Sequence, residues 1–203
     1  MNNIIEIFPT AIGKYELMFT DEEFAFVNNL KRINNISNFL GDDFEILKQK
    51  KLSRLKTFFK ESLNNYLETV YCPKQKFKLK ITQSWVNYTE PNQQHHEHMH
   101  GNSFISGVYY FKTLKNNDGI NFYNLYKPII DFGFIDFVRD FNKFNASETK
   151  LLVHPGLLYL FPSRLVHSTE TNNENDVRIS LSFNTFFKGK IGNKTRLTYL
   201  DIK

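Results

Sequence analysis

The chain has very little cysteine and no long apolar run. Its 203 residues include one cysteine, Cys72, which cannot form an internal disulfide, so a reducing compartment fits best. No segment stays apolar over the roughly 20 residues needed to span a bilayer, and the sequence does not open with a basic and then apolar leader. We therefore expect a soluble cytoplasmic protein.

The chain also lacks internal repeats, a domain linker and a strong charge of one sign. The formal net charge is +5, which permits an acidic partner without demanding one. The 21 Phe and 10 Tyr residues suit a sheet-based interior. We predict one domain over residues 1–203: an N-terminal strand and supporting helices in 1–72, then a β-rich core in 73–188 with an insertion at 124–150.

The first third of the chain shows helical periodicity. Thr20 followed by Glu23 forms a capping-box pattern at the start of a short helix. From about Phe44 to Tyr71, apolar residues recur at steps of three and four, which predicts an amphipathic helix with a Lys-rich outer face. Pro73 ends it.

Beyond Pro73 the apolar period changes to two, which predicts strands. If the alternation holds through Gln83, Trp85 and Asn87 share the face of Ile81. The expected strands cover 77–81, 84–88, 104–111, 157–161 and 178–187, with 120–123 returning as the hairpin partner of 104–111. We expect a short helix near 134–144 and a frayed tail after Gly189. Helices followed by many short strands indicate an antiparallel double-sheet barrel.

Four of the six histidines lie within residues 95–100, just ahead of an expected strand. Two histidines two positions apart on extended chain point to the same side, so His98 and His100 can hold one metal ion. His95 and Glu97 form a second pair with the same spacing. A solvated polar loop is the alternative interpretation of this cluster.

Two residues near the C-terminus extend the hypothesis. His167 follows a strand and Pro162, where its imidazole can turn toward a metal held by His98 and His100. Arg178 and Ser180 share one face of the last strand, and a guanidinium there is suited to hold a carboxylate through two parallel hydrogen bonds with a serine hydroxyl helping.

Together these motifs resemble the iron(II)- and 2-oxoglutarate-dependent dioxygenases, and more narrowly the 2OG-Fe(II) oxygenase family of bacterial and phage proteins. The residues that carry the resemblance lie in the family's order along most of the chain. They are Trp85-x-Asn87, His98-x-His100, Ser103, Ser106-Gly107-Val108-Tyr109-Tyr110, Gly119-Ile120-x-Phe122, Gly156-x-Leu158, Phe161-Pro162-Ser163-x-x-x-His167 and Arg178-x-Ser180-x-Ser182-Phe183-Asn184.

The resemblance implies a double-stranded β-helix, the jelly-roll core also seen in cupins, preceded by helices. It implies Fe(II) and 2-oxoglutarate as cofactors, molecular oxygen as a further substrate, and a bacterial cell or phage-infected host as the setting. Arg178 and Ser180 would bind the far carboxylate of 2-oxoglutarate, while Trp85, Asn87 and Tyr110 would complete the pocket. The implied activity is hydroxylation of an unidentified substrate, with a peptidyl residue as the first candidate. The alternatives are a nucleic-acid oxidative demethylase and a cupin-like metal-binding module without turnover.

The sequence departs from the larger superfamily in its third ligand. That superfamily usually holds iron with two histidines and one carboxylate, whereas the residue two positions after His98 is His100. Three ligand sets therefore stay open: His98, His100 and His167; a near pair of His95 and Glu97; or only two protein ligands.

Overall fold

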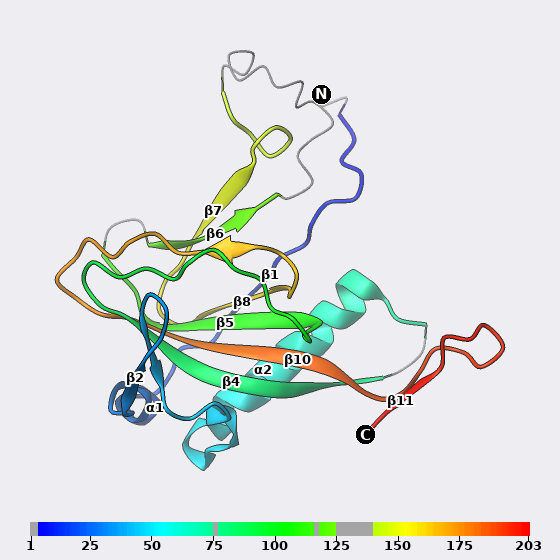
Figure 1. The fold of residues 1–203 in the computed structure, drawn as a ribbon, viewed down its shortest axis with the longest axis horizontal. Helices are drawn as coiled ribbons and strands as arrows, with labels where there is room; N and C mark the ends of the chain where they lie inside the picture. The colour runs from blue at the N-terminus through cyan, green and yellow to red at the C-terminus, as the bar shows by residue number, and fades with distance from the viewer. Residues whose placement is uncertain (1–3, 75–76, 116–117, 125–139) are drawn as a thin grey trace.

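The computed structural model describes residues 4–74, 77–115, 118–124 and 140–203. Within them the chain forms two antiparallel sheets that face each other (Figure 1). The larger sheet has the order β1 (Gly13–Glu16), β8 (Leu157–Pro162), β5 (Ile105–Lys112), β10 (Arg178–Ile191), β4 (Lys78–Thr89), β3 (Phe39–Gly41) and β2 (Arg32–Asn34), with β11 (Leu200–Ile202) paired to the far end of β10. The smaller sheet has the order β7 (Glu148–Leu152), β6 (Gly119–Tyr123) and β9 (His167–Ser168). The expected double-sheet jelly roll is confirmed.

The helices cover the outer face of the larger sheet, on the side away from the smaller one (Figure 1). They are α1 (Asp21–Asn28), the single 3-10 turns η1 (Ile46–Lys48) and η2 (Lys50–Leu52), α2 (Ser53–Tyr66) and the π-helical turn η3 (Leu67–Tyr71). The capping box is present, since Thr20 Oγ1 accepts from the Glu23 amide and the Glu23 carboxylate accepts from the Thr20 amide. No helix in the described ranges is both long and apolar enough to cross a membrane.

The expected single helix from Phe44 to Tyr71 begins later than predicted. The chain before α2 is held against β4, where Ser84 donates its amide to Phe44 O and accepts the Leu47 amide on its hydroxyl. These bonds fix two tight turns in place of a first helical turn.

Two hydrophobic clusters hold the layers together. In the first, α2 packs on the larger sheet, and Phe59 stacks against Phe183 with ring centroids 5.2 Å apart. Gly107 of β5 lies directly beneath Phe183, and a Cβ there would be 2.3 Å from the ring. The second cluster fills the space between the sheets and includes Tyr110 and Phe161.

The sequence predicts that residues 120–123 form a hairpin with β5, and this prediction is wrong. Both edges of β5 are already paired, one with β8 and the other with β10. The chain therefore crosses to the smaller sheet, where β6 pairs with β7 and β9.

The alternation along β4 is also interrupted, so the prediction that Trp85 and Ile81 share a face is wrong. Gln83 pairs with Asn184 and Ile81 pairs with Thr185, which leaves Thr82 as one extra residue in β4. This β-bulge turns Ile81 toward the helix-covered core, while Trp85 faces the space between the sheets.

Two smaller predictions differ from the structure. The first is the helix near 134–144: residues 134–139 lie outside the described ranges, and residues 140–144 contain a bend and a turn instead of a helix. The predicted insertion 124–150 already contains the first residues of β7, and the tail after Gly189 is paired, since β11 returns antiparallel to β10.

Candidate functional site

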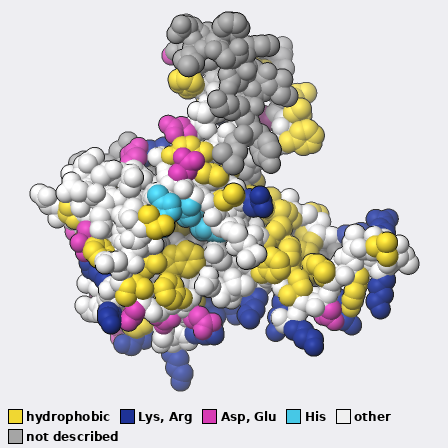
Figure 2. Space-filling view, viewed as in Figure 1, with side chains coloured by type: hydrophobic (Ala, Val, Ile, Leu, Met, Phe, Trp, Pro, Cys, Tyr) yellow, Lys and Arg dark blue, Asp and Glu magenta, His cyan; other side chains and the backbone are white. Residues whose placement is uncertain are grey.

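A small pocket of about 30 Å³ lies between the two sheets. All eight residues predicted for the site line it: His98, His100 and His167 together with Trp85, Asn87, Tyr110, Arg178 and Ser180. Histidine side chains reach the surface near the middle of the face shown in Figure 2. This volume is enough for a few water molecules.

The backbone brings the two distant histidines together. His98 and His167 form an antiparallel bridge in which each amide donates to the other's carbonyl, at 3.0 and 2.9 Å. Their ring centroids are 4.3 Å apart, and the His100 ring is 5.1 Å from His98 and 5.0 Å from His167. One ring nitrogen from each of the three lies within 4.8 Å of the others, the spacing of a group that could hold one metal ion.

A hydrogen bond at Nδ1 of each ring determines whether Nε2 carries a proton. Nδ1 of His98 is 2.8 Å from the His96 carbonyl, and Nδ1 of His167 is 2.9 Å from the Leu165 carbonyl. A carbonyl only accepts, so both Nδ1 atoms carry the proton. Each neutral ring therefore has an unprotonated Nε2, the form in which imidazole binds a metal.

His100 is held the same way by a serine network. Its Nδ1 lies 2.6 Å from Ser106 Oγ, which donates in turn to Asn184 Oδ1 and therefore accepts from the imidazole. Nε2 of His100 is consequently also an acceptor, and it lies 3.2 Å from Nε2 of His98. Two lone pairs at this distance repel each other unless a cation lies beside them, so the donor set fits a metal ion.

The histidines are held neutral. Burial, with a smaller contribution from nearby His98, lowers the pKa of His100 to about 4 and that of His167 to about 3. Burial also lowers the pKa of His98. At neutral pH the three rings are therefore unprotonated, as metal ligands must be.

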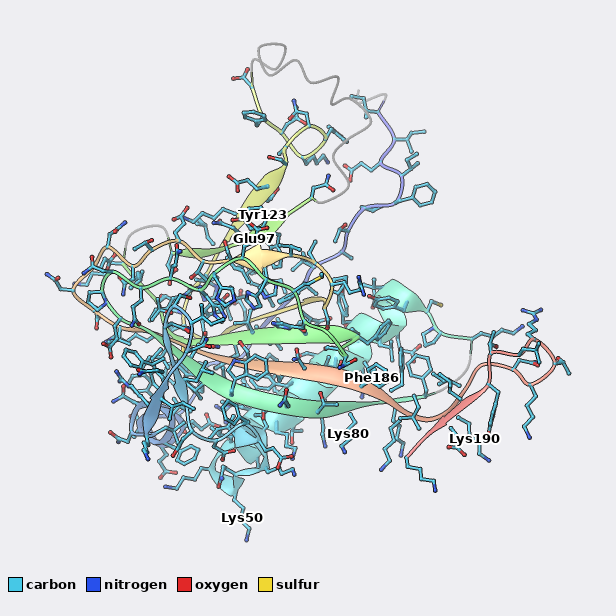
Figure 3. All side chains as sticks on the ribbon, viewed as in Figure 1. Lys50, Lys80, Glu97, Tyr123, Phe186 and Lys190 are labelled. Atoms are coloured by element: carbon cyan, nitrogen blue, oxygen red, sulfur yellow. The ribbon has the colours of Figure 1, made fainter. Side chains whose placement is uncertain are left out.

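The alternative near pair, His95 and Glu97, is placed differently. The His95 ring stacks in parallel on His98, with centroids 4.5 Å apart and an interplanar angle of 11°, but it is not part of the three-residue group. The Glu97 side chain is exposed (Figure 3). Among the described residues, the group whose geometry suits a metal contains three histidines and no carboxylate.

Arg178 is buried at the other end of the pocket, with 4% of its surface exposed. Its Nε lies 3.2 Å from a carboxylate oxygen of Asp118, its Nη2 donates to Gly119 O at 3.2 Å, and its guanidinium lies over the Tyr110 ring at 5.2 Å. Among the described residues, Arg178 Nε and Tyr110 Oη are buried without a hydrogen-bond partner, so the contact of Nε with Asp118 is an ion pair and not a hydrogen bond. Such groups favour a polar ligand that can satisfy them.

Two further predicted residues, Trp85 and Asn87, form a short hydrogen-bonded chain with Ser182 across β4 and β10. Trp85 Nε1 donates to Asn87 Oδ1 at 3.1 Å, and Asn87 Nδ2 donates to Ser182 Oγ at 2.9 Å. The Trp85 ring meets the His100 ring edge-on at 6.0 Å. Asp118 lies in a stretch with the composition of an ordinary turn, and it meets Arg178 only because the chain crosses to the smaller sheet, so no local signal marks it. The place of His95 beside His98 has a signal in the dense histidine run, although the predicted site leaves it out.

Comparison with known proteins is consistent with this arrangement. Residues 83–184 match a family model described as "Putative 2OG-Fe(II) oxygenase". The search of curated proteins found no match. Among solved structures, a 2OG-Fe(II) oxygenase family oxidoreductase from Burkholderia pseudomallei is similar at 10% identity and TM-score 0.57, covering 85% of this chain and 84% of that one.

Two prolyl hydroxylases also share the fold. The Pseudomonas putida prolyl-4-hydroxylase has 12% identity and TM-score 0.54, covering 86% of this chain and 92% of its own. The viral collagen prolyl hydroxylase from Paramecium Bursaria Chlorella virus-1, solved with 2OG, has 13% identity and TM-score 0.54, covering 86% and 94%.

The family match spans half of the chain, including the pocket strands and all three clustered histidines. The chain belongs to the 2OG-Fe(II) oxygenase family. It is accordingly a 2-oxoglutarate- and Fe(II)-dependent oxygenase, an oxidoreductase that uses molecular oxygen.

Proposed function

We propose that His98, His100 and His167 are the protein ligands of Fe(II) in this oxygenase. The observation that carries the proposal is the hydrogen bonding of all three Nδ1 atoms to the protein, which leaves unprotonated ring nitrogens converging on one point. An all-histidine set carries no ligand charge, whereas the commoner set includes one carboxylate. Three protein ligands leave positions open for 2-oxoglutarate and oxygen.

Arg178, with Ser180 beside it, binds the far carboxylate of 2-oxoglutarate in this proposal. A buried carboxylate needs a cation, and a guanidinium can offer it two parallel hydrogen bonds. Asp118 neutralises the buried arginine when that carboxylate is absent. The Tyr110 hydroxyl and Arg178 Nε, which have no hydrogen-bond partner in the part of the chain that the structure describes, supply donors on the same side of the pocket.

When bound, Fe(II) supplies oxidative chemistry in which oxygen and 2-oxoglutarate are consumed, carbon dioxide and succinate are released, and a C–H bond becomes C–OH. The protein contributes position and environment. The His96 and Leu165 carbonyls orient His98 and His167, while Ser106 orients His100. The buried Tyr110 and Phe161 exclude water from the part of the pocket that they line.

The substrate class that we propose is a peptidyl residue. Two of the proteins that share this fold are prolyl hydroxylases, which supports this substrate class by analogy of fold. Oxidative demethylation of nucleic acid is the competing substrate class. A metal-binding module without turnover is the competing account of the pocket.

The test is turnover with peptide pools and ¹⁸O₂. Wild-type protein with Fe(II) and 2-oxoglutarate should release succinate and add one ¹⁸O atom to a peptide, detected by mass spectrometry. His167→Ala should do neither, whereas the exposed surface variant Lys50→Glu should behave as wild type. Release of formaldehyde from methylated oligonucleotides with no label in any peptide would contradict the substrate class. Absence of succinate under every condition would contradict turnover at this pocket.

A further inference from the structure

A second hollow lies on the far side of β4, away from the metal pocket. It has a volume of about 300 Å³ and runs between the first half of β4 and the elements η1 and α2. Six lysines from these elements and from β10 line it: Lys48, Lys56, Lys60, Lys78, Lys80 and Lys188. We call it the lysine groove. Figure 3 labels Lys80 on β4, and Figure 2 shows Lys and Arg side chains gathered along this lower margin of the molecule.

The groove follows a free sheet edge. Residues 78–83 of β4 pair with β10 on one side. On the other side, pairing starts only at Ser84, which bridges to Glu45, and continues with β3 at Asn87 and Tyr88. Among the described residues, no strand covers the outer edge of 78–83, so backbone N–H and C=O groups there can pair with another strand.

The positive charge of the groove is largely uncompensated. Lys48 forms an ion pair with Glu45 at 2.5 Å. The other five lysines have no carboxylate within ion-pairing distance in the part of the chain that the structure describes. Lys78 lies directly opposite Lys188 in the β4–β10 register, and like charges at facing positions are unfavourable. An anionic ligand would relieve this repulsion.

The groove is not uniformly polar. Leu79 and Ile81 alternate with Lys78 and Lys80 along β4 and are half-buried against the helix-covered core. A strand added to this edge would present its side chains to both faces in turn. One row would meet Lys78, Lys80 and Lys188 on the opposite face of the sheet. The other would meet Leu79, Ile81 and Leu47, with the lysines of η1 and α2 beside them.

We propose that the lysine groove binds an extended acidic peptide segment, which adds a strand to the free edge of β4 and alternates acidic with apolar residues. Backbone pairing supplies affinity in this mode of recognition, and the alternating contacts supply specificity. The site is separate from the metal pocket, so the proposal goes beyond the proposed function and does not depend on it.

Two other interpretations are less favoured by the same observations. Single-stranded nucleic acid is commonly bound by aromatic platforms beside basic residues, and no aromatic side chain lines this groove among the described residues. Lysines can also serve only to keep a free edge from pairing with other chains. That role alone does not account for a hollow with an apolar floor.

The binding test uses fluorescence anisotropy with labelled synthetic peptides and protein free of iron and 2-oxoglutarate, so its outcome is independent of the metal site. A peptide of alternating Glu and Val should bind saturably and weaken with added salt. A Lys/Val peptide of the same length should not bind. N-methylation of alternate residues should abolish binding when it removes the donors facing β4, and the opposite set of methylations should have little effect. Equal binding of both methylated peptides would overturn strand addition.

Charge-reversal variants locate the site. Lys80→Glu should weaken the Glu/Val peptide about tenfold or more, equivalent to a loss of at least about 1.4 kcal/mol. Lys50→Glu, an exposed change on η2 outside the groove, should leave binding unchanged (Figure 3). Equal binding by wild type and Lys80→Glu, no binding of the acidic peptide at all, or tighter binding of an oligothymidylate would each overturn the proposal.

Discussion

Each of the three clustered histidines donates its Nδ1 proton to the protein, which fixes the ring and the nitrogen that remains free. The partners of His98 and His167 are backbone carbonyls two residues away, so these orientations are built into the local chain. The partner of His100 is a serine on β5. This arrangement explains why a run of histidines in the sequence becomes one convergent donor set with His167.

Arg178→Ala should weaken 2-oxoglutarate binding without removing the metal. Truncating one partner of a buried charge pair costs about 2–5 kcal/mol, so the apparent binding constant should rise by a factor on the order of thirty or more. Arg178→Lys should recover part of the loss, because an ammonium lacks the planar fork. The measurement is calorimetric titration of 2-oxoglutarate into metal-loaded protein under anaerobic conditions.

The exposed Arg164→Ala variant is the matched control and should bind 2-oxoglutarate as wild type does. Equal affinity in wild type and Arg178→Ala would show that this arginine serves only its internal pair with Asp118.

At the scale of secondary-structure elements, local patterns predicted most strands and the residues that line the pocket. The sequence spacing could bring His98 and His100 to one side and place Arg178 beside Ser180 on one strand. It could not reveal Thr82 as an extra residue in β4, because a bulge depends on the register with β10. Nor could it show that both edges of β5 are filled, which sends β6 to the other sheet. Asp118 was missed for the same reason, since it meets Arg178 only through this crossing.

Gly107→Ala should destabilise the packing of β5 against α2. A methyl group would be 2.3 Å from the Phe183 ring, which is fully buried and stacked on Phe59. Overpacking of this kind costs about 1–3 kcal/mol, so the melting temperature should fall by several degrees.

Differential scanning calorimetry measures this effect. Gly101→Ala is the matched control, since a Cβ at Gly101 would have no neighbour within 4 Å. A melting temperature for Gly107→Ala equal to that of wild type would contradict the described packing of Phe183.

At the scale of the whole molecule, the buried histidines link stability to pH. Burial lowers the pKa of His100 and His167 well below the 6.5 expected in the unfolded chain. Between pH 6.5 and about 4 the unfolded chain therefore binds more protons than the folded protein, so stability falls as pH falls through this window. Each histidine contributes a slope of at most about 1.4 kcal/mol per pH unit.

Urea denaturation of metal-free protein at pH 7 and pH 5 measures this dependence. His167→Gln removes one titrating ring and should lose less stability than wild type between the two pH values. Identical losses in the two proteins would show that His167 does not titrate with a lowered pKa.

The most direct test of the proposed metal site is a calorimetric titration of Fe(II), under anaerobic conditions, into wild type and four variants. Wild type should bind one equivalent. His167→Ala and His98→Ala should lose this binding, because each removes one of the three converging ring nitrogens. His100→Asp, which restores the commoner two-histidine-one-carboxylate set, should retain it, as should Glu97→Ala. Stoichiometric binding by His167→Ala, or its loss in Glu97→Ala, would contradict the proposed metal site.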